Sequence, residues 1–174
     1  MKRNLLIFLF VILFNVLGAQ TIKGHRYKGF VNVECLRGND GVYYGFNSLG
    51  GGINSIHGYQ INSNLFIGAG TGFHYYSTDH FGKSYSIPLF SDFRAHFNSN
   101  KLSPYFDARL GYSVGDIEGI YASPSFGLRV AIGENVGFNV SVGYTAQGFK
   151  YKETYYSTER SYIHNLTISA GVDF

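Results

Sequence analysis

The final segment of the chain alternates strictly between two kinds of residue. One set of positions is apolar, and the positions between them are polar or small. The apolar set is Leu166, Ile168, Ala170, Val172 and Phe174, and the other set is Asn165, Thr167, Ser169, Gly171 and Asp173. Successive side chains of a β-strand point to opposite faces. The pattern therefore predicts a strand over residues 162–174 whose two faces meet different surroundings.

The same alternation recurs along the chain. It is clear in three further segments, 101–114, 120–133 and 135–147, and noisier in four earlier ones, 26–37, 52–62, 64–76 and 84–97. The weakest is 52–62, because Ile53, Ile56 and Ile61 do not share one face. The pattern predicts eight strands and no helix among them.

The connections between the predicted strands alternate in length. Short connections rich in turn formers lie at 62–64, 98–101 and 133–135, and longer ones at 38–51, 77–83 and 148–160. Only 115–119 is short in the second set. Tight turns on one rim and longer loops on the other are typical of an up-and-down antiparallel barrel that crosses a membrane.

The three prolines test this interpretation, because proline cannot donate to a strand ladder. Pro88, Pro104 and Pro124 are expected in the first few residues of their strands. There each proline would remove one hydrogen bond near a rim, which a closed barrel can tolerate.

The N-terminus has the pattern of a secretory signal. Lys2 and Arg3 precede an unbroken apolar run at 5–14, and Gly18 and Ala19 follow. The run is shorter than the roughly 20 residues that a spanning helix needs. We expect a signal peptide over 1–19 and a single barrel domain over 20–174.

Composition agrees with a membrane barrel. Charged residues make up 14% and aromatic residues 18% of the chain, against roughly 25% charged in ordinary globular domains. Cys35 is the only cysteine, which excludes an intrachain disulfide, and the net charge of +3 gives no electrostatic reason to bind nucleic acid. In a transmembrane barrel the apolar residues that face lipid alternate with residues that face the lumen, so the membrane-facing band does not appear as a continuous apolar run.

The terminal Phe174, preceded by apolar residues at alternate positions, resembles the assembly signal of bacterial outer-membrane barrels. The eight-strand plan resembles the small barrels of the outer-membrane protein A and X type. The resemblance implies residence in the bacterial outer membrane and contact with its lipid and lipopolysaccharide. It also implies recognition of the last strand by the barrel-assembly machinery. It brings no catalytic motif and no cofactor.

Charged side chains fall on the predicted inward faces. They are Glu34, Asp92, Arg94, Asp107, Arg109 and Arg129, with Asp173 near the end of the last strand. An eight-stranded barrel is just wide enough for side chains to fill, so buried charges there must pair. We expect a packed polar network, with a narrow ion or proton path as the alternative.

The segment Gly68-Ala-Gly-Thr-Gly72 superficially resembles a phosphate-binding loop, but the residues after it continue as strand rather than helix. We expect its glycines to make room for inward rings such as Phe66, Phe90 or Tyr105.

A catalytic site is the next possibility to weigh. Lipid A deacylases of this barrel type use His and Ser two residues apart on one strand. This chain has only the reverse order, Ser55-Ile-His57. His25, His80 and His164 show no metal-site spacing, so no metal is expected.

The charged, tyrosine-rich segment 148–160 is the predicted contact surface, with Tyr151, Lys152, Tyr155 and Tyr156 as candidates. The expected function is therefore structural or surface-interacting, without catalysis. Three alternatives stay open: a lipid A-modifying enzyme, a narrow channel, and a soluble barrel with apolar residues inside.

Overall fold

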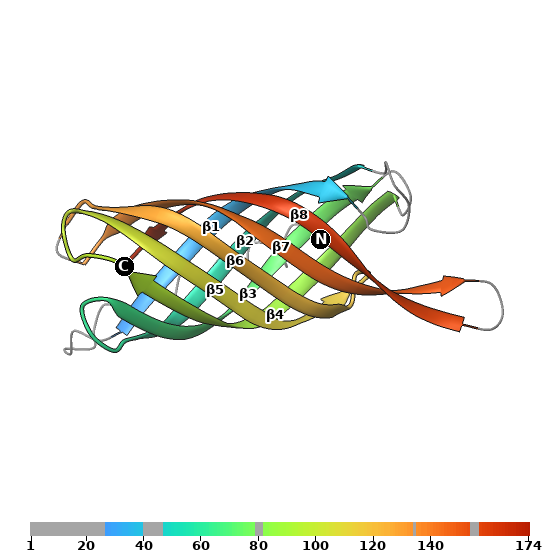
Figure 1. Cartoon of the computed structure of the whole chain (residues 1–174), viewed down its shortest axis with the longest axis horizontal. Helices are drawn as coiled ribbons and strands as arrows, with labels where there is room; N and C mark the ends of the chain where they lie inside the picture. The colour runs from blue at the N-terminus through green and yellow to red at the C-terminus, as the bar shows by residue number, and fades with distance from the viewer. Residues whose placement is uncertain (1–26, 40–46, 79–81, 134, 154–156) are drawn as a thin grey trace, which may run out of the picture.

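The computed structural model describes residues 27–39, 47–78, 82–133, 135–153 and 157–174, so the expected signal peptide at 1–19 lies outside the described residues. Eight strands are present: β1 Tyr27–Asn39, β2 Asn47–Gln60, β3 Leu65–Thr78, β4 Gly82–His96, β5 Leu102–Gly115, β6 Gly119–Ala131, β7 Gly137–Glu153 and β8 Ser157–Asp173. Neighbouring strands pair antiparallel and β1 pairs with β8, which closes the barrel predicted from the alternation (Figure 1).

The described part of the chain has no helix long and apolar enough to cross a membrane, a finding that does not bear on strands.

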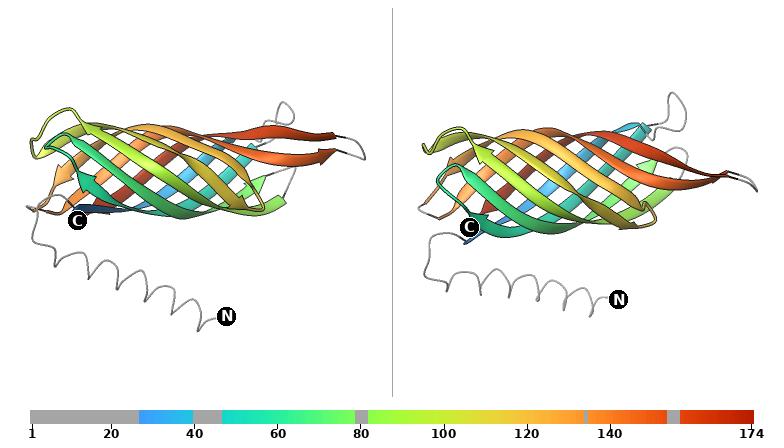
Figure 2. Two further views of the ribbon diagram at one scale, coloured as in Figure 1. Left: turned by 90° about the horizontal axis from the view of Figure 1, so that it is seen from below. Right: turned by 60° about the horizontal axis from the view of Figure 1, so that its bottom comes forward.

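The barrel has two different ends (Figure 2). The turn end holds the short connections 61–64, 97–101 and 132–136, together with the start of β1 and the end of β8. The loop end holds the connections that follow β1, β3, β5 and β7. The predicted alternation of short and long connections is wrong for most of this end: the connections after β3, β5 and β7 hold three residues each, because the strands continue into the predicted loops, and only the one after β1, with seven, is longer than the four or five residues of the turn-end connections.

Three strand boundaries differ from the predicted ones by more than two residues. β2 begins at Asn47 rather than at 52, because its first residues include three glycines that leave no periodic signal. β7 continues to Glu153 and β8 begins at Ser157, so the predicted loop over 148–160 is mostly strand. Apart from Phe149 and Tyr151, those added residues are polar or glycine, so the apolar–polar contrast is too weak to show a period of two.

The end of β7 and the start of β8 pair only with each other. The last pair between β6 and β7 is Tyr121 with Gln147, and the last pair between β1 and β8 is Asn39 with His164. Pairs from Gly148–Tyr162 to Glu153–Ser157 continue beyond both. This segment, residues 148–162, is called the projecting hairpin, and it extends past the other strands in Figure 1.

The prolines lie partly where expected. Pro104 is near the start of β5, but Pro88 and Pro124 lie near the middle of β4 and β6, so that prediction is wrong for them. Pro88 and Pro124 each interrupt the ladder on one side only. β3–β4 pairing is broken between Thr71–Leu89 and His74–Ser86, whereas β5 still pairs with both prolines.

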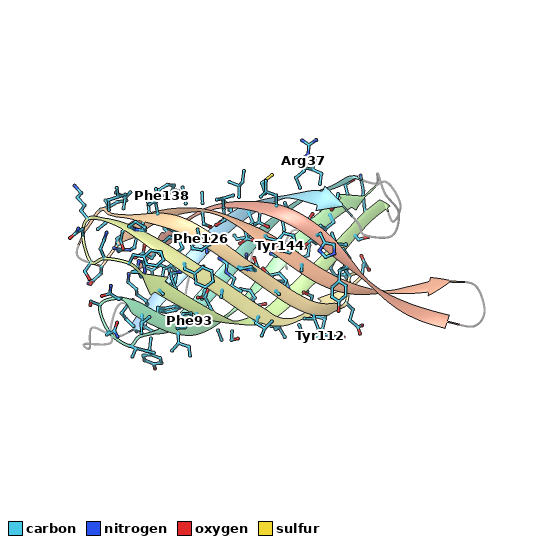
Figure 3. The ribbon with its side chains drawn as sticks, in the orientation of Figure 1. Arg37, Phe93, Tyr112, Phe126, Phe138 and Tyr144 are labelled. Carbon is cyan, nitrogen blue, oxygen red and sulfur yellow. The ribbon has the colours of Figure 1, made fainter. Side chains whose placement is uncertain are left out.

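The outer surface of the barrel is apolar. Large side chains on it are broadly exposed in the isolated chain, for example Leu110 at 62%, Phe126 at 61% and Ile168 at 59%. Figure 3 shows Phe93, Phe126 and Phe138 pointing outward. Because the inward faces hold most of the buried charged and amide side chains, the alternative of a soluble barrel with an apolar interior is wrong. Such a surface requires lipid.

The glycines of β3 make room for two of the three predicted rings. A Cβ on Gly68 would lie 2.7 Å from the Phe66 ring, and one on Gly70 would lie 2.7 Å from the Phe90 ring. The third ring, Tyr105, lies instead against Gly127 of β6.

The seam between β1 and β8 closes tightly. Phe174 exchanges two backbone hydrogen bonds with Gly29, at 2.9 and 3.0 Å. Farther along, a Cβ on Gly38 would lie 1.7 Å from the backbone oxygen of His164. The two strands approach so closely there that only glycine fits.

Substituting Gly38→Ala should destabilise the barrel by about 1–3 kcal/mol, because the new methyl group forces the seam apart. Urea unfolding in detergent micelles measures the change. The heat-dependent gel shift of the folded barrel is the readout. Gly51→Ala is the matched control, since a Cβ there has only one neighbour, at 3.6 Å. Equal unfolding midpoints for the two variants would contradict the close approach.

Candidate functional site

An ion-pair network fills the middle of the lumen, and Arg109 of β5 is its centre. Arg109 donates to Glu34 Oε1 at 2.5 Å and to Asp107 Oδ2 at 3.3 Å, and its Nε lies 3.6 Å from Asp92 Oδ2. Arg94 donates to the same Asp107 oxygen at 2.6 Å. All five side chains are almost completely buried. We call these five residues the lumen ion network.

Aromatic rings complete the surroundings of the two arginines. The Arg94 guanidinium lies 3.9 Å from the Phe30 ring centroid and 4.6 Å from that of Tyr105. Arg109 lies 5.6 Å from the centroid of Phe90. A guanidinium over a ring face is attracted by the π-electrons and loses little when it is desolvated. Both arginines of the network are therefore packed against aromatic rings.

Arg129, which the sequence analysis grouped with this set, belongs to a second cluster at the turn end. It donates to both carboxylate oxygens of Asp173, with distances of 2.7–2.9 Å. Lys28 donates to the same carboxylate at 2.9 Å. The Arg129 and Lys28 side chains are 13% and 19% exposed. The predicted inward charges thus form two separate groups.

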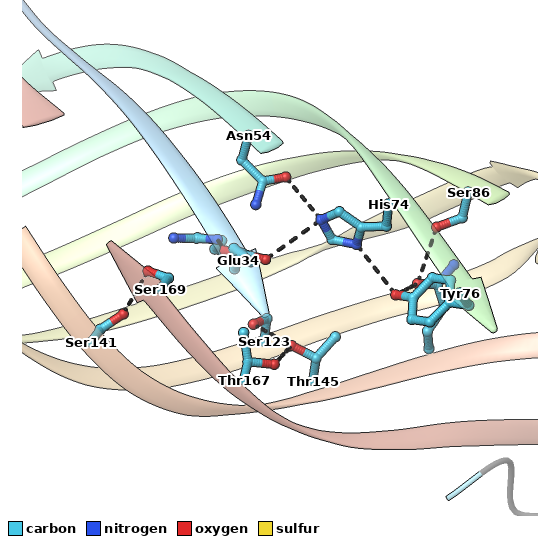
Figure 4. A network of polar contacts seen from close by, with 12 residues as sticks. Glu34, Asn54, His74, Tyr76, Ser86, Ser123, Ser141, Thr145, Thr167 and Ser169 are labelled. Carbon is cyan, nitrogen blue, oxygen red and sulfur yellow. Dashed lines mark hydrogen bonds and ion pairs between the residues drawn. The ribbon is translucent and has the colours of Figure 1, made fainter. Parts of the chain in front are cut away.

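A band of hydroxyl groups covers the inward face of β6, β7 and β8 (Figure 4). Ser123 lies 2.9 Å from Thr145, which lies 2.7 Å from Thr167, and Ser141 lies 2.9 Å from Ser169. Together with Ser125, these residues are called the hydroxyl wall. The sequence analysis did not identify it as a feature, although its members are the small polar positions of three predicted strands. The Ser123–Thr145 contact spans the ladder break at Pro124.

Toward the loop end, four buried residues form an apolar cluster: Leu36, Tyr76, Ile117 and Ile163. Ile117 comes from the short connection between β5 and β6, and it is only 5% exposed. Gln147 holds it by donating to its carbonyl oxygen at 3.3 Å. The sequence analysis read this connection only as a short loop, so this inward residue was missed.

The Ser55–His57 pair lies on the outer wall of the barrel. Ser55 Oγ is 2.9 Å from His57 Nε2, and the other ring nitrogen is 2.5 Å from the Tyr27 hydroxyl. His57 also meets the edge of the Phe174 ring. Because β2 ends at Gln60 and β1 begins at Tyr27, the pair lies toward the turn end.

The predicted contact residues fall in or beside the projecting hairpin. Tyr151 pairs with Glu159 and Lys152 with Thr158 along the ladder, but their side chains lie outside the description. Tyr155 and Tyr156 lie outside the described residues. Among the described residues, no group of three or more His, Cys, Asp or Glu side chains could hold a metal ion.

No family model and no curated protein matches this chain. Solved structures do. Neisserial surface protein A aligns with a TM-score of 0.57 at 16% identity, covering 84% of this chain and 95% of that one. OprG of Pseudomonas aeruginosa aligns at 0.55 and 11%, covering 88% and 97%. The outer-membrane enzyme PagL aligns at 0.55 and 14%, covering 80% and 97%.

These likenesses show the fold. The chain has the eight-stranded antiparallel barrel of the small outer-membrane proteins, and its apolar belt matches a position in that membrane. One of the similar structures is named as an enzyme and the others are not. The fold therefore leaves the role to be argued from the residues of this chain.

Substituting Arg109→Ala should lower the free energy of unfolding by about 3–5 kcal/mol, because three buried carboxylates lose their shared cation. Unfolding in detergent micelles with urea measures the change. Arg37→Ala is the control, since Arg37 is exposed on the outer face of β1 (Figure 3). If both variants unfold alike, the lumen ion network does not stabilise the barrel.

Proposed function

We propose that the protein is an outer-membrane scaffold that presents its projecting hairpin outside the cell, without catalysis. The single observation that supports this is the length of β7 and β8, 17 residues each. A strand needs roughly 9–11 residues to cross the bilayer. The excess lies at one end, beyond the last pairs with β6 and β1. It serves no purpose in spanning the membrane.

The orientation follows from the connections. In outer-membrane barrels the short turns face the periplasm and the longer loops face outward. The end with the seven-residue connection after β1 and the projecting hairpin is the extended one, so on this rule the turn end of the barrel is periplasmic and the projecting hairpin reaches the medium past the lipopolysaccharide. Its tyrosines and lysines suit contact with that lipid or with an outer ligand. Phe174 is then at the periplasmic rim, where the assembly machinery is expected to act.

Site-directed labelling tests this orientation. In a Cys35→Ser background, Thr158→Cys places a thiol on the projecting hairpin and Ser99→Cys places one in a turn between β4 and β5. A membrane-impermeant maleimide added to intact cells should label Thr158→Cys and leave Ser99→Cys unlabelled. Labelling of the turn variant alone would reverse the orientation. Recovery of the protein in the soluble fraction would remove it from the membrane.

Hydrolysis of a lipid ester is a second candidate, favoured by the 2.9 Å contact between Ser55 and His57. A serine whose proton can pass to an adjacent imidazole is an activated nucleophile. The position argues against lipid A as the substrate, because the pair lies toward the turn end, away from the outer leaflet. A hydrolase there would meet glycerophospholipid of the periplasmic leaflet. In a Ser–His–acid triad a carboxylate contacts the other ring nitrogen of the histidine. Here the Tyr27 hydroxyl contacts that nitrogen.

Ser55→Ala and His57→Ala separate the two functions. On the scaffold proposal, purified protein reconstituted in phosphatidylethanolamine vesicles releases no more free fatty acid than empty vesicles, and neither substitution changes this. Thr71→Ala, at the position paired with Ser55, is the control for altering the outer wall. Fatty-acid release that disappears in both variants and persists in the control would establish the hydrolase instead.

A further inference from the structure

Arg37 is a cation on the lipid-facing wall of the barrel. Its side chain is exposed and points outward from β1 (Figure 3). The residues that pair with it, Leu49 of β2 and Leu166 of β8, are both 57% exposed on the same outer face. A charged side chain among lipid-facing leucines is costly unless an anion or the head-group region receives its charge.

Within the described part of the chain, nothing neutralises Arg37. Its side chain takes part in no ion pair, hydrogen bond or ring contact there. The segments that surround it on the wall, 36–39, 47–50, 144–148 and 162–167, contain no acidic residue. Among the described residues, the positive charge on this part of the wall is therefore unbalanced.

His164 is the polar neighbour of Arg37 on this wall. It precedes Leu166 by two residues on β8, so it lies diagonally across the seam from Arg37 on the same outer face. Diagonal neighbours in an antiparallel pair are about 7–8 Å apart, which a long side chain can span. The His164 side chain is exposed. The seam thus places an imidazole beside the unpaired guanidinium.

Two tyrosine rings contact this imidazole. Tyr144 of β7 stacks on it, with ring centroids 5.8 Å apart and an interplanar angle of 24°, and the centroid of Tyr162 lies 6.2 Å away. The Tyr144 hydroxyl also contacts His164 Nδ1. When that hydroxyl donates to Nδ1, the proton of the neutral ring lies on Nε2. Nε2 has no partner in the described part of the chain, so it is a free N–H donor.

These side chains lie toward the loop end of the apolar belt. In Figure 3, Arg37 and Tyr144 are closer to that end than Phe93, Phe126 and Phe138. Tyrosine is enriched where the hydrocarbon meets the lipid head groups. Arginine matches a phosphate group with two parallel N–H donors. The position and the donors together fit the phosphate of a lipid head group.

We propose that Arg37 and His164, supported by Tyr144 and Tyr162, bind one phosphate group of lipid A on the outer wall of β7, β8 and β1. A phosphate supplies acceptor oxygens and the missing negative charge. A second copy of the chain fits less well, because the described wall around Arg37 has no carboxylate for the same cations. The choice of lipid A rests on the proposed outward orientation of the loop end, whereas the phosphate chemistry does not.

The test is lipid binding to the purified full barrel in detergent micelles. Bisphosphorylated lipid A and dephosphorylated lipid A with the same acyl chains are titrated, and native mass spectrometry counts the bound lipid at each concentration. The unmodified protein should bind the phosphorylated form about tenfold more tightly, because only that form makes the charge-assisted hydrogen bonds. Arg37→Ala should abolish this preference. Arg37→Lys should keep part of it, since lysine preserves the charge but not the planar fork.

Two further variants locate the site. His164→Phe keeps a ring beside Tyr144 but removes the N–H donor, so it should weaken binding of the phosphorylated form by about threefold. Lys83→Ala is the matched control, since Lys83 is an exposed cation near the same end but on β4, away from the seam. It should bind like the unmodified protein. Heat-shifted gel mobility first establishes that each variant is folded, and Arg37→Gln replaces Arg37→Ala if the latter does not fold.

Equal binding of the two lipid A forms would overturn the phosphate site. A preference that survives Arg37→Ala would overturn its location, and an equal loss in Lys83→Ala would reduce it to general attraction between cations and anionic lipid. Phosphatidylglycerol that competes as well as lipid A would overturn the choice of lipid. Binding in micelles is independent of orientation, so the cysteine labelling described above can fail without altering this result.

Discussion

Closure of the backbone hydrogen-bond ladder between β1 and β8 is the constraint on which the rest of the molecule depends. Lipid offers no partner for an open strand edge, so a sheet in a membrane must close on itself. Once eight strands close, the lumen is narrow, and every second side chain must enter it. The charges, rings and glycines of the interior then have to fit one another, as Arg94 fits Phe30 and Gly70 fits Phe90. The tight approach at Gly38 is a local expression of the same requirement.

The alternation of apolar and polar residues predicted the fold well, because the two faces of each strand meet lipid and lumen. It failed where that contrast disappears. The first residues of β2 include Gly50, Gly51 and Gly52, which carry no pattern. Apart from its aromatic residues the projecting hairpin is polar or glycine, so its two faces show little contrast in sequence. The apolar–polar alternation shows where the two faces of a strand meet different surroundings. It does not show where the strand ends.

The candidate site was predictable as a set and not as a geometry. Every second residue of a strand faces the lumen, so the sequence alone could assign Glu34, Arg109 and Arg129 to it. Their partners depend on strand register around the closed barrel, which brings together Glu34 and Arg109 from distant strands and separates Arg129 toward Asp173. Ile117 was invisible for a different reason. A residue in a short connection has no periodic neighbours, and only its burial with Leu36, Tyr76 and Ile163 reveals that it turns inward.

The projecting hairpin also has a consequence for how the sequence can change over time. Its ladder pairs join β7 only to β8, and neither β6 nor β1 accompanies it. Amino-acid changes in most of this segment therefore touch neither the seam nor the lumen packing. On the proposed orientation this segment faces the medium, and its recognition by antibodies or phages can drift while the barrel stays the same. For the same reason the segment between Glu153 and Ser157 is a natural point at which to insert a foreign peptide for display.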